Sequence, residues 1–318
     1  LPADAAQGQS GSMIALDHGV RYLDLNYLGT DRLIACAVLE SPEGLLLVDP
    51  GPTSALDNLK AALREAGASL ADVRVLLLTH IHLDHAGAAG TIAAEAPHVQ
   101  VYVHRIGAPH LVDPSRLLAS ARRLYGELME PLWGAVLPVP ERQIVALEGG
   151  ETIRPGGRTL EVAYTPGHAV HHVSFFDPET GMAFVGDTAG MQITGTRCVL
   201  PVAPPPDIQV EAWHESLERI ARWQPRKLFV THFGPSDDPE THLAQMARRL
   251  DAMAEAVRNS LDTEGDDAQR AEAFHEQVMA ELRECLQDEA LVSRYEQFDQ
   301  PRASWFGLAR YWRRKLQD

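Results

Sequence analysis

The chain has 318 residues, of which 28 are basic and 44 acidic, so its formal net charge at pH 7 is −16. So acidic a chain lacks the basic surface that nucleic-acid binding requires and is repelled by anionic membranes, and we expect neither partner. Its 45% hydrophobic and 23% charged residues are typical of a globular protein. No apolar run approaches the roughly 18 residues of a membrane-spanning helix.

The cysteines and the first residues bear on the compartment in which the protein is found. Cys36, Cys198 and Cys285 are odd in number and widely spaced, unlike a disulfide framework or a CxxC metal site. We therefore expect buried, reduced thiols in a cytoplasmic protein. Residues 1–12 are small and polar and lack the charged and apolar regions of a signal peptide, so we interpret them as a tag or a disordered segment before Met13.

Short apolar runs alternate with helical patterns over residues 13–238, which we predict to form one domain. The run at 73–79, VRVLLLT, is typical of a buried central strand. Two strand-rich halves separated by helices predict two β-layers with helices outside, an α/β fold. The expected strands are 32–40, 44–48, 73–79, 100–103, 143–147, 159–164, 173–176, 182–185 and 227–231, and the expected helices are 53–66, 87–96, 115–130 and 210–221.

From residue 239 the pattern becomes helical only, with three apolar stripes at a spacing of three to four residues. We predict a helical extension over 239–318 that packs on the main domain. It contains a dense aromatic group, and such groups favour interfaces. A lid beside the functional site and a homodimer surface both remain open. The group consists of Trp305, Phe306, Tyr311 and Trp312.

Four side chains of the types that bind metals follow the buried strand directly, in the segment THIHLDHAG: His80, His82, Asp84 and His85. His80 and His82 are two residues apart, so on extended backbone they point the same way. Asp84 and His85, which we expect in the following loop, can face a second ion. Imidazole and carboxylate together suit zinc, iron or manganese, and the carboxyl end of a central strand is a common place for α/β sites.

Three further metal-binding side chains stand where predicted strands end. His168 follows a strand and the turn Thr165-Pro166-Gly167, and Asp187 follows Val185-Gly186. His232 ends the strand at 227–231, and its Thr231-His232 junction repeats Thr79-His80. Each residue alone is weak evidence, but with the HxHxDH segment they predict one shared metal site.

HxHxDH followed by His, Asp and His in this order resembles the metallo-β-lactamase superfamily of hydrolases, over roughly residues 23–234. The resemblance implies a four-layer αββα sandwich with a dinuclear site at one edge of the β-sandwich. Within the domain we predict a helical insertion at 108–137. Asp49, in VDPG, and His172, in GHxxxH, match family positions that hydrogen-bond to ligands and orient them. The implied ligands are His80, His82 and His168 for one ion and Asp84, His85 and His232 for the other, with Asp187 bridging both.

The resemblance implies hydrolysis of a small molecule by a metal-bridging hydroxide, with Asp84 accepting or relaying a proton. Zinc is the expected ion, although iron, manganese and cobalt accept the same ligands. The bridging aspartate argues against a dedicated β-lactamase. Ala86-Gly87-Ala88 after the motif departs from glyoxalase II enzymes, and Gly190 replaces a tyrosine that lactonases usually carry.

The segments 113–140 and 201–207 are inserted between ligand positions, and their leucine, tyrosine, tryptophan and proline favour a partly apolar substrate. An ester, lactone or thioester hydrolase is therefore expected. One alternative is an oxygenase similar to the persulfide dioxygenases, which use a single iron, so the complete second ligand set counts against it. Another is a metal-binding regulatory protein that acts through its C-terminal helices.

Overall fold

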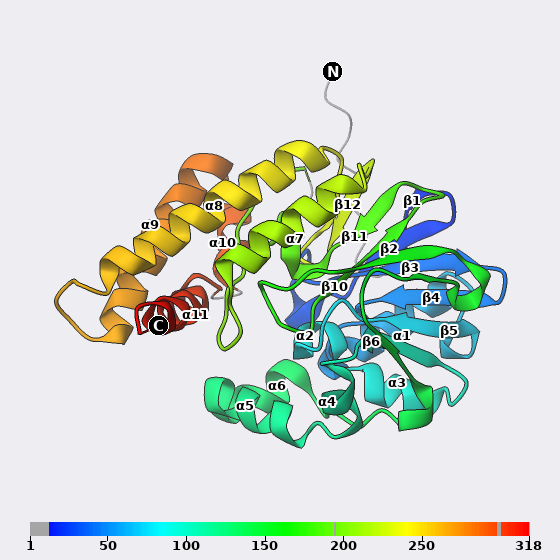
Figure 1. Cartoon of the computed structure of the whole chain (residues 1–318). Coiled ribbons are helices and arrows are strands. Elements are labelled where there is room, and N and C mark those ends of the chain that lie inside the picture. Colours follow the sequence, from blue (N-terminus) through cyan, green and yellow to red (C-terminus); the bar gives the residue numbers. More distant parts are fainter. Residues whose placement is uncertain (1–12, 194, 298–299, 318) are drawn as a thin grey trace.

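The computed structural model describes residues 13–193, 195–297 and 300–317; the predicted tag at 1–12 lies outside the described residues. Two stacked sheets with helices on both outer faces form an αββα sandwich, which confirms the predicted fold class (Figure 1). In the described part of the chain, the first sheet has seven strands in chain order. They are β1 (Ile14–Asp17), β2 (Val20–Asp24), β3 (Ala35–Ser41), β4 (Gly44–Val48), β5 (Val73–Leu77), β6 (Gln100–His104) and β7 (Ile144–Leu147).

The second sheet has the order β13-β12-β11-β10-β9-β8. Its neighbours pair antiparallel except β11 and β12, which run parallel because a helix crosses between them. The carboxyl ends of β5 in the first sheet and of β12 in the second each lead into a predicted metal ligand, His80 and His232. The strands are β8 (Thr152–Ile153), β9 (Leu160–Tyr164), β10 (Val173–Asp177), β11 (Met182–Phe184), β12 (Lys227–Val230) and β13 (Gly234–Ser236).

Three apolar clusters fill the three interfaces between these four layers. Helices α1 (Leu56–Glu65) and α3 (Ala89–Glu95) cover the first sheet through residues such as Leu59 and Ile92. Phe175 and Phe229 lie in the cluster between the sheets. Helices α7 (Val210–Arg222) and α8 (Pro239–Ser260) cover the second sheet. The predicted 3–4 spacing of α1 holds, since Leu56, Leu59, Ala62 and Leu63 are all buried.

The insertion after β6 is broken into short helices, where the sequence predicted one helix over 115–130. They are α4 (Ala108–Val112), α5 (Ser115–Tyr125) and α6 (Met129–Trp133). The break falls at Gly126, whose φ of 54° lies in the left-handed region that glycine adopts without steric cost. A short 3-10 turn, Gly126–Leu128, then redirects the chain.

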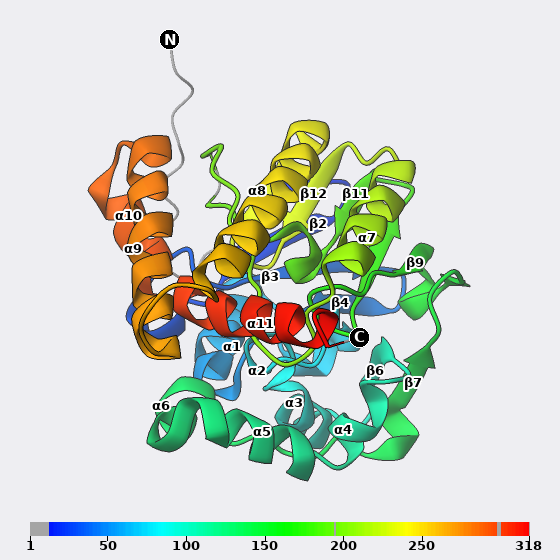
Figure 2. The same ribbon diagram turned by 60° about the vertical axis from the view of Figure 1, so that its left-hand side comes forward.

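The extension consists of α8, α9 (Asp267–Leu286), α10 (Glu289–Gln297) and α11 (Gln300–Lys315). α11 packs against both α8 and α9 (Figures 1 and 2). Two members of the aromatic group make contacts within the chain. Trp305 is fully buried, and Trp312 donates its indole N–H to Ala254 O at 2.7 Å. Phe306 is exposed. Among the residues described, no helix is long and apolar enough to cross a membrane.

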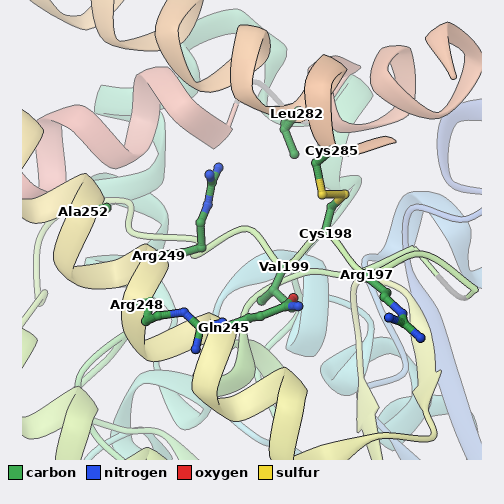
Figure 3. A pocket seen from close by; sticks show the side chains of 9 residues that line it. All are labelled: Arg197, Cys198, Val199, Gln245, Arg248, Arg249, Ala252, Leu282 and Cys285. Atoms are coloured by element: carbon green, nitrogen blue, oxygen red, sulfur yellow. A yellow bond between two sulfur atoms is a disulfide. The ribbon is translucent and has the colours of Figure 1, made fainter. Parts of the chain in front are cut away.

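Cys198 and Cys285 form a disulfide, so the prediction of three reduced thiols is wrong for this pair; Cys36 is free and buried. The two Cα atoms lie 6.1 Å apart, within the usual range for a disulfide. The pair is 87 residues apart in sequence, and only the packing of α9 against the 197–199 loop brings the cysteines together. Figure 3 shows the bond beside a cavity of about 350 Å³ that Gln245 and Leu282 also line.

Candidate metal centre

The HxHxDH segment begins at His80, three residues after the end of β5, and continues into a single helical turn, α2 (Leu83–Ala86). His80 and His82 precede the turn, and His82 has extended backbone (φ −60°, ψ 150°) at its N-cap. Asp84 and His85 lie in the turn rather than in the loop that the sequence predicted. The backbone of His82 accepts the first helical hydrogen bonds, from His85 N at 3.1 Å and Ala86 N at 2.9 Å.

The predicted ligands come together from both sheets in three overlapping groups. Within each group one donor atom per residue lies within 4.8 Å of the others. Neighbouring groups share His80 or His85, so they form one continuous cluster. The groups are His80, His82 and His168; His80, His85 and Asp187; and Asp84, His85 and His232.

Asp187 stands between the outer groups. Its Oδ2 lies 3.5 Å from His168 Nε2, whereas its Oδ1 lies 3.2 Å from His85 Nε2. On the first side, His168 Nε2 and His82 Nδ1 are 3.0 Å apart. Two nitrogens bound to one tetrahedral zinc ion are about 3.4 Å apart. At 3.0–3.5 Å, these donor atoms are about as close together as the ligands of one ion.

Asp49 is the most heavily hydrogen-bonded carboxylate beside this cluster, and the left-handed backbone at its position (φ 49°) turns it inward after β4. It accepts hydrogen bonds from Thr79 N (2.8 Å), Thr79 Oγ1 (2.8 Å) and Thr231 Oγ1 (2.7 Å). His85 Nδ1 donates to it at 2.8 Å. This bond fixes the tautomer of His85 and leaves Nε2 for a metal ion.

Backbone carbonyls orient two more of the histidines. His232 Nδ1 donates to Leu33 O at 2.9 Å, and His168 Nδ1 donates to Val202 O at 2.7 Å. His80 Nδ1 lies 3.1 Å from Thr79 Oγ1. Sequence reasoning missed these partners. The repeated Thr-His junction pointed to the two threonines, but a carbonyl carries no residue-type signal, since every residue has one.

His172 is fully buried near the cluster but in a different relationship from the one expected. Its Nδ1 lies 2.9 Å from Thr165 Oγ1 and 3.2 Å from Thr188 Oγ1, not beside a ligand atom. Its ring stacks on His80, with centroids 5.0 Å apart. A Cβ on Gly186 would come within 2.7 Å of His172 Nε2, so glycine there permits the close approach. His172 therefore packs against His80 and does not hydrogen-bond to it.

Burial and neighbouring charges set opposite pKa shifts within the cluster. Burial, together with nearby His168, lowers the pKa of His82 to about 3. Burial also lowers the pKa of His80 well below its usual value, helped by the other imidazoles. Burial acts the same way on His85, but Asp187, Asp84 and Asp49 outweigh it and raise the pKa of His85. Neutral imidazoles are the form that binds metal ions, so His80 and His82 are already in that form, whereas His85 would release a proton as an ion binds.

His171 was missed by the sequence analysis although it lies beside this site. It is 7% exposed, its ring centroid lies 5.7 Å from that of His82, and its Nδ1 has no hydrogen-bond partner among the residues described. Burial lowers its pKa well below the usual value. The sequence signal was present in His171-His172, but the family pattern drew attention only to the second histidine.

The family model described as the metallo-beta-lactamase superfamily matches residues 29–232. The chain belongs to this superfamily. The match covers every predicted metal-site residue. The family match ends before the C-terminal helices begin.

Curated relatives and solved structures agree with this membership. The chain is 30% identical over 176 residues to the metallo-beta-lactamase fold-containing protein ST1585 of Sulfurisphaera tokodaii, a match that spans 54% of the chain and 65% of that protein. It is 29% identical to the hydroxyacylglutathione hydrolase of Maricaulis maris, over 64% of the chain and 70% of that enzyme. The metallo-beta-lactamase family protein TTHA1429 of Thermus thermophilus shares the fold, with a TM-score of 0.66, 23% identity and 89% coverage of both chains.

Proposed function

We propose that this protein is a dinuclear metal-dependent hydrolase that cleaves an ester, lactone or thioester of a small, partly apolar molecule. The observation that carries the proposal is the position of Asp187 between two complete groups of donors, with one oxygen toward each. A carboxylate placed in this way suits two adjacent ions better than one. Zinc is the ion we propose, since imidazole and carboxylate are among its usual ligands.

The donor set fits divalent ions. His80 Nε2 is buried and has no hydrogen-bond partner among the residues described. An orphaned buried nitrogen costs free energy unless a ligand satisfies it. His80, His82 and His168 would hold one ion and Asp84, His85 and His232 the other, with Asp187 shared. When bound, such ions lower the pKa of water and polarise a carbonyl oxygen.

Asp84 is the residue we propose as the catalytic proton acceptor. Burial raises its pKa, but His85 and His232 outweigh burial and lower the pKa to about 2, so the carboxylate is ionised at neutral pH. Its side chain is 15% exposed, whereas those of His85 and Asp187 are 0% and 2% exposed. A substrate or leaving group therefore meets Asp84 first among these three. With so low a pKa, Asp84 would relay a proton to the leaving group or to solvent rather than hold it.

The insertion supports a partly apolar substrate. Leu124 and Leu128 are 55% and 59% exposed, so this part of the insertion presents apolar side chains to solvent. Tyr125 beside them packs its ring edge-on against Trp133, with centroids 5.1 Å apart. Burial, and then the charge of Asp84, raises the pKa of Tyr125, so its hydroxyl stays protonated. The hydroxyacylglutathione hydrolases among the relatives support an acyl thioester as one candidate.

The test is proton release from a panel of lactones, thioesters, phosphodiesters and a β-lactam after reconstitution with two equivalents of zinc, manganese or iron. We expect turnover only on lactones, esters or thioesters, and its loss in Asp187→Ala. The control is Asp237→Asn, an exposed carboxylate paired with Lys227, which should keep full turnover. No turnover on any substrate with two ions bound would contradict the proposal.

The other sequence-based expectations stay predictions. A single-iron oxygenase requires only one set of donors, and the second set around His85 counts against it. A regulatory role through the C-terminal helices and a homodimer both stay open. The cytoplasmic location also stays a prediction, and the Cys198–Cys285 disulfide counts against it, since disulfides persist mainly in oxidising compartments.

A further inference from the structure

One peptide unit connects the C-terminal extension to a proposed metal ligand. Val202 O accepts the hydrogen bond from His168 Nδ1 at 2.7 Å, and Ala203 N, in the same peptide unit, donates to Ser304 Oγ of α11 at 2.9 Å. This peptide bond is trans, since the cis bonds of the described residues lie elsewhere. Its C=O and N–H therefore point in opposite directions, and the peptide unit lies between Ser304 and His168.

Both ends of this connection are shielded from water. Ser304 and Ala203 are 0% exposed, and His168 is 1% exposed. A hydrogen bond in such an environment is stronger than in water, and bonds in a chain polarise one another. When Ser304 accepts from the peptide N–H, it makes Val202 O a better acceptor for His168 Nδ1. That bond keeps the proton on Nδ1 and leaves Nε2, which faces His82 and Asp187, as the donor to metal.

The close approach of α11 is built into its sequence. Gly307 lies one helical turn after Ser304, and a Cβ there would meet Ala203 O at 2.0 Å and Pro204 C at 2.9 Å. Only glycine lets the helix backbone come this near the 202–204 segment. The hydroxyl of Ser304 is thereby placed within hydrogen-bond distance of the peptide, and α11 has little freedom to slide along it.

Other parts of the extension hold the same region of the chain. Tyr295 of α10 accepts from Ile193 N at 3.1 Å and donates to Cys198 O at 2.8 Å. His242 of α8 lies 2.8 Å from Ala189 O through its Nε2. These contacts hold Ala189, Ile193 and Cys198, which follow Asp187 in the chain, while Ser304 holds the segment behind His168. The extension therefore touches the supports of two proposed ligands.

We propose that Ser304 is a positioning residue for His168, and that α11 is thereby a working part of the metal centre. This inference rests on the proposed function in one respect, since it takes His168 to bind an ion. The proposal gives the C-terminal extension a role in the metal centre of its own chain, whereas the regulatory alternative gives it only a role in binding a partner.

The experiment compares Ser304→Ala with Ser260→Ala. Ser260 of α8 accepts the Trp305 indole N–H at 2.9 Å, so its variant also deprives a donor on α11 of its acceptor but leaves the 202–204 segment untouched. Zinc affinity is measured by chelator competition, and the Nδ1 proton of His168 is followed by NMR with 15N-labelled histidine. Thermal midpoints of the metal-free proteins show how much stability each variant loses.

We expect Ser304→Ala to weaken one of the two zinc-binding events about 10-fold, in the range for residues that support a metal ligand, and to shift the His168 Nδ1 resonance. Ser304→Cys, whose thiol is a weaker acceptor, should fall between Ser304→Ala and the natural protein. Ser260→Ala should lower the thermal midpoint without changing either affinity. Unchanged zinc affinities in Ser304→Ala, or equal losses in both alanine variants, would overturn the proposal.

The proposed function can fail separately. If the natural protein binds zinc at His168 but hydrolyses none of the panel, the hydrolase proposal is wrong. The comparison of zinc affinities then still decides the role of Ser304, because it depends on binding and on the His168 signal and not on turnover.

Discussion

Asp49 and His85 form a fully buried pair in which the imidazole Nδ1 donates to the carboxylate at 2.8 Å, with both side chains 0% exposed. The same carboxylate holds Thr79 at the end of β5 and Thr231 at the end of β12. One side chain thus ties together the two strand ends from which His80 and His232 project. Asp49 therefore contributes to the relative position of the two ligand sets.

Asp49→Asn tests that contribution. The amide replaces one acceptor oxygen with an NH₂ group that faces existing donors, and it removes the negative charge that favours the Nδ1–H tautomer of His85. We expect zinc affinity to fall about 10- to 100-fold, with a parallel loss of turnover. Chelator competition and initial rates measure both. If affinity falls but turnover at saturating zinc is unchanged, the pair only holds metal and does not align it.

Arg158 and Asp177 form a second buried pair, which joins the two sheets. Arg158 donates to Asp177 Oδ2 through Nε at 3.0 Å and to Glu40 O of β3 through Nη1 at 2.7 Å. Arg158→Leu leaves the Asp177 carboxylate, 0% exposed, without its charged partner. We expect the free energy of unfolding to fall by roughly 3–5 kcal/mol, measured by denaturant titration.

The double variant Arg158→Leu/Asp177→Leu separates the loss of the pair from the cost of a stranded charge. Removing both charges leaves no isolated buried ion, so the double variant should be more stable than Arg158→Leu alone. A double variant less stable than the single one would show that the pair itself, and not the unpaired carboxylate, governs the loss.

The sequence predicted the ligand cluster because the information is local. Strand ends, the HxHxDH spacing and the Thr-His junctions lie in short segments, and the edge of an α/β sandwich gathers such segments. The carbonyls of Leu33 and Val202, which orient His232 and His168, left no trace in residue type. The Cys198–Cys285 pair was missed for another reason: its distance depends on how α9 packs, and a separation of 87 residues says nothing about that. Gly126 was a signal that the helix of the insertion could end there. The apolar residues on both sides of it keep a helical spacing, however, and so predicted one continuous helix.

His104 gives a pH dependence with a definite sign. Burial, chiefly, lowers its pKa below the usual 6.5, and its ring stacks on Tyr164 with centroids 4.4 Å apart. Below pH 6.5 the unfolded chain binds this proton more readily than the folded chain. The contribution to stability is therefore full above pH 6.5 and is lost as the pH falls through the lowered pKa.

His104→Phe keeps an aromatic ring against Tyr164 and removes the titration. The difference in unfolding free energy between natural protein and variant, measured from about pH 8 to about pH 4, should be flat above pH 6.5. Below that pH it should shift in favour of the variant. A difference that is constant over the whole range would contradict the depressed pKa, whatever the other histidines do, because they are common to both proteins.

The disulfide predicts how many cysteine thiols react under each condition. Burial raises the pKa of the Cys36 thiol, so the folded protein should show no reactive thiol toward a disulfide reagent. Unfolding without reductant should expose one thiol, and unfolding with reductant three.

Cys285→Ser should lower the free energy of unfolding by about 2–4 kcal/mol, because the cross-link closes a long loop. Cys36→Ala is the matched control, since it removes a cysteine without opening that loop and should leave the reductant-dependent change in stability intact. Three reactive thiols in the unreduced, unfolded chain would show instead that the extension is held to the 197–199 loop by packing alone.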